Sequence, residues 1–204
     1  MSTQLLIGII DDGEWRVAQR YKMYEDDELY NQASIILDRL KYYADTICDN
    51  LHHCKFVVLF NDMSEEKEEE ISTLSVFKGA AIIDDIIDCP KYQEILLHDA
   101  RNFIKDELYC RYSFIINFDT RTLSAYHCGD KFLCGTYDLN NLPRVDSMME
   151  DLARSESENQ REAHRIICAP ILKMIRENAV SEGKDPNEAE ENFLNELSTC
   201  QDEK

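Results

Sequence analysis

Two hairpin-like segments constrain the fold of this chain most, because in each of them two strand-like stretches flank a turn. The first joins an apolar run at residues 5–10 to an alternating stretch at 15–21 through a turn at 11–13 that ends in Asp-Gly. Asp-Gly is a preferred dipeptide of tight hairpin turns, and alternation is typical of half-buried strands. The second segment alternates over 112–118 and returns over 123–127. We therefore predict two β-hairpins.

The residues between the hairpins mainly predict helices. Apolar side chains recur every three or four positions from residue 28 to 51, which is the pattern of one long amphipathic helix. Helical spacing also runs through 80–87 and 92–109, and a break is expected at Cys89-Pro90 because the residue before proline avoids helical backbone angles. The short apolar run at 56–60 favours a strand.

The C-terminal third predicts one more strand and then helices. The strand at 131–136 extends the second hairpin, and helices follow at 148–157 and 162–178, the latter kinked at Pro170. Asp185 is suited to cap a last helix. The expected fold class is α+β: an antiparallel sheet from the N-terminal and central hairpins is packed with helices and followed by a helical C-terminal extension.

We divide the chain into a core domain, residues 1–145, and the helical extension, residues 146–204.

The net charge of the whole chain argues against several classes of partner. Lys and Arg number 22 against 41 Asp and Glu, a net charge of −19, so we expect neither nucleic acid nor an anionic membrane surface as a partner. Residues 62–70 alone hold six acids and one lysine, and we expect them to be solvated.

The compartment is inferred from missing signals. No apolar run approaches the roughly 20 residues of a membrane helix, and the first run lacks the basic flank of an export signal. We expect a cytoplasmic protein whose eight cysteines are reduced thiols.

One acidic motif resembles a magnesium site. Asp84-Asp85-Ile86-Ile87-Asp88 matches the DDxxD pattern of prenyl-diphosphate enzymes, in which carboxylates one helical turn apart hold Mg²⁺ against a diphosphate. No second aspartate-rich helix accompanies it, so the polar outer face of a helix is the simpler interpretation.

Side chains that can bind zinc also gather in one segment. Four of them lie within seven residues: Cys48, His52, His53 and Cys54. Structural zinc usually takes its four ligands from two separate pairs, and no second pair follows, although Cys128 and Cys134 flank a predicted turn. We predict neither a metal site nor a cofactor from this pattern.

Nucleophilic chemistry has one weak candidate. Ser2 or Thr3 would become an N-terminal nucleophile if the chain were trimmed there, with its own amino group as the base. No glycine-rich phosphate loop, nucleophile elbow or metalloprotease motif is present, so an enzyme is not favoured.

Aromatic and charged residues near the N-terminus suggest a binding surface. Trp and Tyr are frequent anchors of protein interfaces, although packing in a half-buried position is the alternative. The predicted binding residues are Trp15, Arg16, Arg20, Tyr21, Tyr24 and Asp26.

Two segments resemble an uncharacterised family of phage, bacterial and fungal proteins. Val17-Ala18-Gln19 and residues 32–40 stand where that family has a Val-Ala-Gln-Tyr-like strand and a Gln-Gly-x-x-Ile-Leu helix, and 106–126 is similar to its Tyr-Val-Ile-Asn-Leu-Asp hairpin. The family's Arg-Gly and Asp-Gly-Tyr-Pro are Gln4-Leu5 and residues 24–27 here. The resemblance covers about residues 3–145 and implies fold and boundaries, not an activity.

Together these observations favour an acidic cytosolic interaction protein that binds and inhibits or regulates a partner protein, with a basic partner favoured by charge. Two alternatives stay open. One is a hydrolase that uses an N-terminal nucleophile or the carboxylates of residues 84–88. The other is a binder of a small molecule or nucleotide messenger, with a pocket containing Arg16, Arg20 or Arg111.

Overall fold

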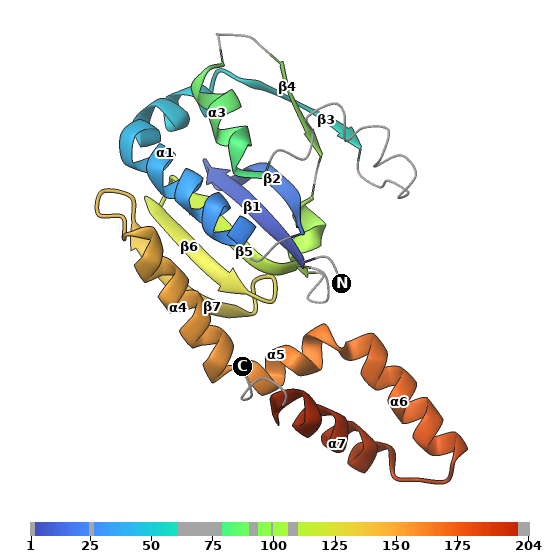
Figure 1. Cartoon of the computed structure of the whole chain (residues 1–204). Coiled ribbons are helices and arrows are strands. Elements are labelled where there is room, and N and C mark those ends of the chain that lie inside the picture. The colour runs from blue at the N-terminus through green and yellow to red at the C-terminus, as the bar shows by residue number, and fades with distance from the viewer. Residues whose placement is uncertain are drawn as a thin grey trace.

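The computed structural model describes residues 3–24, 27–60, 79–89, 94–98, 100–105 and 110–199. It confirms the predicted α+β class, with a five-stranded sheet, helices packed on it and a helical C-terminal arm (Figure 1). The sheet has the order β2-β1-β5-β6-β7. Its strands are β1 (Thr3–Asp11), β2 (Glu14–Met23), β5 (Cys110–Asn117), β6 (Thr122–His127) and β7 (Phe132–Asp138).

Both predicted hairpins are present. β1 and β2 pair antiparallel around Asp12 and Gly13, whose positive φ angles of 53° and 72° are those a tight hairpin turn requires. β5, β6 and β7 form an antiparallel meander. The hairpins join through a parallel pairing of β1 with β5. Parallel neighbours need a long crossover connection, and the chain between β2 and β5 supplies it.

Helix α1 (Asp27–Leu51) covers one face of the sheet. The N–H of Tyr24 donates to Glu28 Oε2 at 2.7 Å just before the helix. Ile36, Leu40 and Ile47 are almost completely buried in the main core, together with Phe114 of β5. Each such side chain contributes about 1.5–3 kcal/mol through its removal from water, which is why the apolar stripe of α1 fixes the helix on the sheet.

The predicted helix at 92–109 is wrong over its first half. Residues 94–98 form strand β4 (Glu94–His98), which pairs in parallel with β3 (Lys55–Phe60) in a separate two-stranded sheet. The apolar run 95–97 is too short for its period to separate strand from helix, and an available neighbouring strand decides the outcome. The short helix η3 (Arg101–Lys105) follows. Residues 62–70 lie outside the described residues.

The opposite face of the main sheet carries a second, smaller core. Leu6, Ala18 and Ile115 pack there against Ile104 of η3, and the Trp15 ring lies over Gly8. A Cβ atom added to Gly8 would come within 2.3 Å of that ring, so only glycine allows the indole to lie this close to β1. On the α1 side, the helix predicted at 80–87 is present as η2 (Gly79–Ala81) and α3 (Ile82–Ile87).

The C-terminal residues form four helices. α4 (Val145–Glu158) adds Met148 and Leu152 to the main core. The helix predicted at 162–178 is divided into α5 (Gln160–Ile167) and α6 (Ala169–Ser181), because proline fits the first turn of a helix and not its interior. α7 (Pro186–Thr199) follows, and the N–H of Asn187 donates to Asp185 Oδ1 at 2.8 Å. The division at residue 145 stays a prediction.

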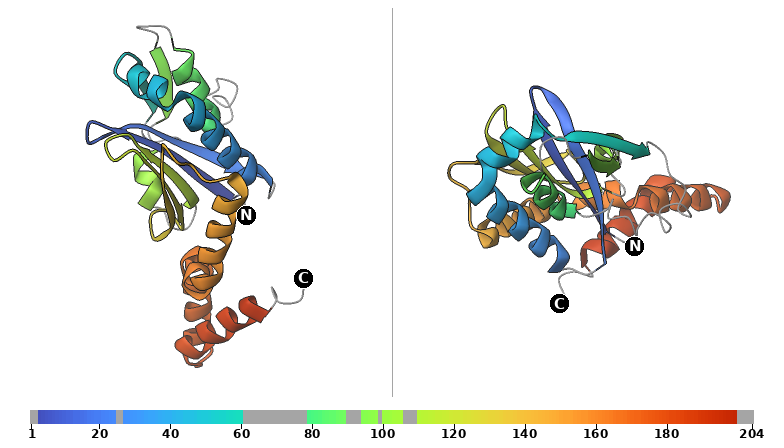
Figure 2. Two further views of the ribbon diagram at one scale, coloured as in Figure 1. Left: turned by 90° about the vertical axis from the view of Figure 1, so that its left-hand side faces the viewer. Right: turned by 90° about the horizontal axis from the view of Figure 1, so that it is seen from above.

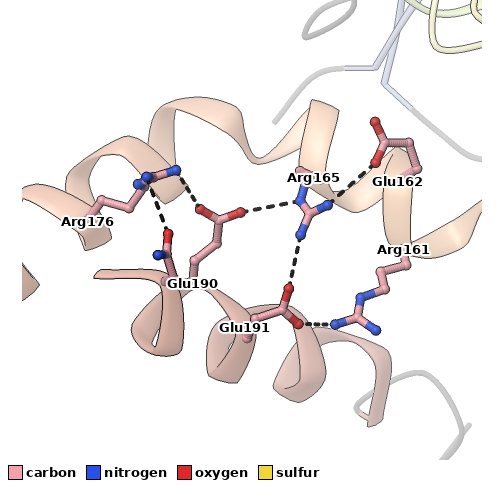
Figure 3. A network of polar contacts seen from close by, with 7 residues as sticks. Arg161, Glu162, Arg165, Arg176, Glu190 and Glu191 are labelled. Atoms are coloured by element: carbon pink, nitrogen blue, oxygen red, sulfur yellow. Dashed lines mark hydrogen bonds and ion pairs between the residues drawn. The ribbon is translucent and has the colours of Figure 1, made fainter. Parts of the chain in front are cut away.

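Helices α5, α6 and α7 make an arm that projects from the sheet (Figure 2). Arg165 contacts Glu190 at 3.3 Å and Glu191 at 3.1 Å, and Arg176 contacts Glu190 at 3.2 Å (Figure 3). Single exposed ion pairs contribute little, but this network joins α7 to both other helices. Within the residues described, no helix combines the length and the apolar character needed to cross a membrane.

Candidate functional sites

The predicted binding residues of β2 do not lie on one face of the sheet. Ile9 pairs with Val17 but Ile10 pairs with Trp15, so Arg16 is an extra residue in a β-bulge. The bulge inverts the alternation that the sequence suggested. Trp15 therefore packs in the smaller core, whereas Tyr21 packs against the main core on the α1 side.

The charged members of the predicted set make contacts within the chain. Arg16 donates from Nη2 to the carbonyl oxygen of Leu51 at 2.9 Å, and the Arg20 guanidinium lies 5.5 Å from the centre of the Phe103 ring. Tyr24 is 75% exposed at the end of β2. Asp26 lies outside the described residues. The set is thus spread over two faces, and its role in binding stays a prediction.

One acid of the α3 motif makes a contact within the fold. Asp84 accepts a hydrogen bond from Arg39 Nε at 2.5 Å, which joins α3 to α1. Asp85 is half-buried and Asp88 is exposed. Among the described residues, these acids join no group of three ligand side chains. Thr3 begins β1 and Ser2 lies outside the described residues.

The four side chains at 48–54 that can bind zinc do not come together at one site. Cys54 is buried, and its pKa is raised to about 12 by burial and by the neighbouring Cys89 thiol, while His53 is exposed. Cys48 and His52 instead meet Asp11, which the sequence analysis did not connect with them. Cys48 Sγ lies 3.9 Å from Asp11 Oδ1, and His52 Nε2 lies 3.5 Å from Asp11 Oδ2.

Cys128 and Cys134 do not join this group. Cys128 is buried against Ala163 and Ile166 of α5. Burial raises the pKa of the Cys134 thiol. Burial also raises the pKa of the Cys48 thiol, and the negative charge of Asp11 raises it further.

A second group of charged side chains surrounds Glu156 of α4, and sequence reasoning missed it. Glu156 forms an ion pair with Arg111 of β5 and accepts a hydrogen bond from Tyr112 Oη at 3.2 Å. His127 of β6 is completely buried, with Nε2 3.6 Å from a Glu156 oxygen. The sequence holds one signal of this group: polar residues occur within the segments whose pattern predicts strands.

The surroundings of this group shift several pKa values. Burial lowers the pKa of His127 because it disfavours the imidazolium, and this outweighs the attraction of Glu156. Burial also lowers the pKa of His164. Burial alone would raise the pKa of Glu156, but the charge and hydrogen bond of Arg111 outweigh it and the net direction is downward.

We expect stability to fall as the pH is lowered from about 7 to 5. His127 and His164 bind a proton more readily in the unfolded chain, so their contribution is complete above 6.5 and is lost as the pH falls below it. The slope is up to about 1.4 kcal/mol per pH unit for each histidine. Below 4.5, protonation of Glu156 adds a further loss.

Urea unfolding at a series of pH values measures this dependence. The groups facing His127 are Arg111, Tyr112, Glu156, Cys128 and His164. The variant His127→Gln should reduce the slope between about pH 5 and 7, whereas His53→Gln, at an exposed position, should leave it unchanged. Equal slopes in all three proteins would contradict the assignment to His127.

The outward side of α1 carries the third candidate site. Tyr42 is 65% exposed, and Asp38 and Asp45 lie one helical turn before and after it. Asp49 lies one turn beyond Asp45, and the Lys41 ammonium is 5.3 Å from the Tyr42 ring centre. We call Asp38, Lys41, Tyr42, Asp45 and Asp49 the α1 outer face.

Comparison of the chain with protein-family models, with curated proteins and with solved structures finds no significant match. The resemblance drawn from two sequence segments therefore stays a prediction.

Proposed function

We propose that the chain is an interaction protein that binds a basic partner protein through the α1 outer face and thereby inhibits or regulates it. The observation that carries this proposal is Tyr42, a large aromatic side chain that is 65% exposed between two aspartates. Tyrosine is frequent among the residues that dominate binding energy, because it buries a large area with few rotatable bonds.

The charges around Tyr42 favour a basic surface. Asp45 is 86% exposed and contacts Arg121 at 3.2 Å, and Asp38 contacts Arg39 at 2.8 Å. Exposed ion pairs of this kind contribute little, so a partner's lysine or arginine can replace them at small cost. The net charge of −19 would speed the encounter with a basic protein at low salt.

The arginines that a nucleotide-messenger binder would use are engaged elsewhere. Arg16 binds the end of α1, Arg20 lies over Phe103, and Arg111 is paired with Glu156. These contacts favour the interaction protein over the alternative of a phosphate-binding pocket.

Affinity capture with the full chain tests the proposal. Wild-type protein, the variant Tyr42→Ala/Asp45→Asn/Asp49→Asn, and a control are immobilised and exposed to lysate at about 50 mM and about 0.5 M salt. The control, Leu133→Ala/Glu150→Gln/Glu158→Gln, removes one exposed apolar side chain and two exposed acids elsewhere. We expect a basic protein that is retained at low salt by wild type and control, released at high salt, and absent from the α1 variant.

Two results would contradict this expectation. Retention of the same proteins by the α1 variant and wild type would show that another surface binds them. Capture of no protein at low salt would argue against the interaction function itself, because screening is weakest there.

A further inference from the structure

We propose that Asp11, Cys48 and His52 form a binding site for a Zn²⁺ ion. One donor atom from each side chain lies within 4.8 Å of the other two. Asp11 ends β1, Cys48 lies in the last turn of α1, and His52 comes one residue after that helix. Carboxylate oxygen, thiolate sulfur and imidazole nitrogen are the ligands that zinc takes in proteins.

The distances in this group are close to those around a tetrahedral ion. With ordinary bond lengths, Zn²⁺ holds a nitrogen and an oxygen ligand about 3.3 Å apart, and a sulfur and an oxygen about 3.5 Å apart. His52 Nε2 lies 3.5 Å from Asp11 Oδ2 and Cys48 Sγ lies 3.9 Å from Asp11 Oδ1, so each carboxylate oxygen faces one of the other two ligands. Small rotations of the side chains would complete the coordination.

The state of Asp11 points independently to a cation. Its side chain is buried, with 4% of the residue exposed, and Oδ2 has no hydrogen-bond partner. A buried carboxylate oxygen that accepts no hydrogen bond is costly even with the His52 ring 3.5 Å away, and a bound cation would remove that cost. The carbonyl groups at the C-terminal end of α1 add a partial negative charge close to the same place.

A second layer of contacts would orient the histidine. His52 Nδ1 lies 3.7 Å from Asp12 Oδ2, while Nε2 faces Asp11. Histidine ligands of zinc commonly donate the N–H of the other ring nitrogen to a carboxylate, and this hydrogen bond fixes the orientation of the ring. Asp12 is itself held in the hairpin turn, because its N–H and that of Gly13 each donate to Asp119 at 2.8 Å.

The donor set favours zinc over a hard cation. Asp11, Asp12 and Asp119 also lie close together, but both Asp119 oxygens accept backbone hydrogen bonds. Mg²⁺ and Ca²⁺ prefer oxygen ligands, whereas a thiol and an imidazole suit Zn²⁺. Three protein ligands leave the fourth position of a tetrahedral ion to water.

Metal titration of the full, reduced chain tests this site. Co²⁺ serves as a coloured substitute for Zn²⁺, and Zn²⁺ affinity is measured by competition with a chromophoric chelator. We expect one ion per chain, tetrahedral Co²⁺ bands and a thiolate-to-Co²⁺ charge-transfer band. Asp11→Asn, Cys48→Ser and His52→Ala should each lower the affinity on the order of 100-fold or more, and Asp12→Asn by about 10- to 100-fold.

Matched controls make the outcome decisive. His53→Ala removes the neighbouring exposed histidine, and Cys168→Ser removes a half-buried thiol of the arm. Both should retain the affinity and the charge-transfer band. The proposal is overturned if Zn²⁺ does not bind stoichiometrically, if the ligand variants bind as the controls do, or if the protein binds Ca²⁺ or Mg²⁺ in preference and Cys48→Ser has no effect.

Discussion

Replacing Phe114 with alanine is expected to lower the free energy of unfolding by about 3–5 kcal/mol. Phe114 is completely buried in the central strand β5, where it pairs with Ile7 of β1 and with Ala125 of β6. Removing the ring reduces the apolar area that folding buries. It also leaves a cavity that the two neighbouring strands cannot close. Urea unfolding followed by far-ultraviolet circular dichroism measures the loss.

Leu133→Ala is the matched control for this variant. Leu133 is 57% exposed on the edge strand β7, so its truncation should change stability by no more than about 0.5 kcal/mol. Similar unfolding midpoints for the two variants would mean that Phe114 does not lie in the main core.

The second large effect is expected for Glu156→Ala, at about 2–3 kcal/mol. The variant leaves the Arg111 guanidinium without its carboxylate and removes the acceptor of the Tyr112 hydroxyl. Breaking a fully buried ion pair costs about 3–5 kcal/mol, and the partial exposure of both side chains lowers the expected loss. The same urea measurement near neutral pH gives the value.

Two further variants define what Glu156 contributes. Glu150→Ala removes an exposed acid from the same helix and should change stability by no more than about 0.5 kcal/mol. Glu156→Gln keeps an acceptor oxygen for Tyr112, so its loss should lie between those of the two alanine variants. If Glu156→Ala and Glu150→Ala unfolded at the same urea concentration, the ion pair with Arg111 would have no role in stability.

The parts of the fold that could be predicted from sequence are those with a long, unbroken period. The helix expected at 28–51 is α1 at 27–51, since six turns of apolar spacing leave little ambiguity. The strand β4 was missed because its apolar run fits either period, and strand pairing with β3 decides between them. The bulge at Arg16 was also invisible, since a bulge changes no residue type in the pattern.

The candidate metal site shows the same limit. Cys48 and His52 could be picked out because they belong to four zinc-type side chains within seven residues. Asp11 lies 37 residues before Cys48, and only the packing of α1 against the β1–β2 hairpin brings it to them. Glu156, 45 residues from Arg111, was beyond prediction for the same reason. Sequence spacing identifies partners within one element, and tertiary packing supplies the others.

The parallel pairing of β1 with β5 has a consequence for synthesis on the ribosome. Ile7 pairs with Phe114, so the N-terminal hairpin waits for about one hundred further residues before its neighbouring strand exists. At roughly 5–20 residues per second, that delay is about 5–20 s. For this time one long edge of the nascent hairpin lacks its partner, which makes the half-made chain a natural client for chaperones that shield unpaired strands.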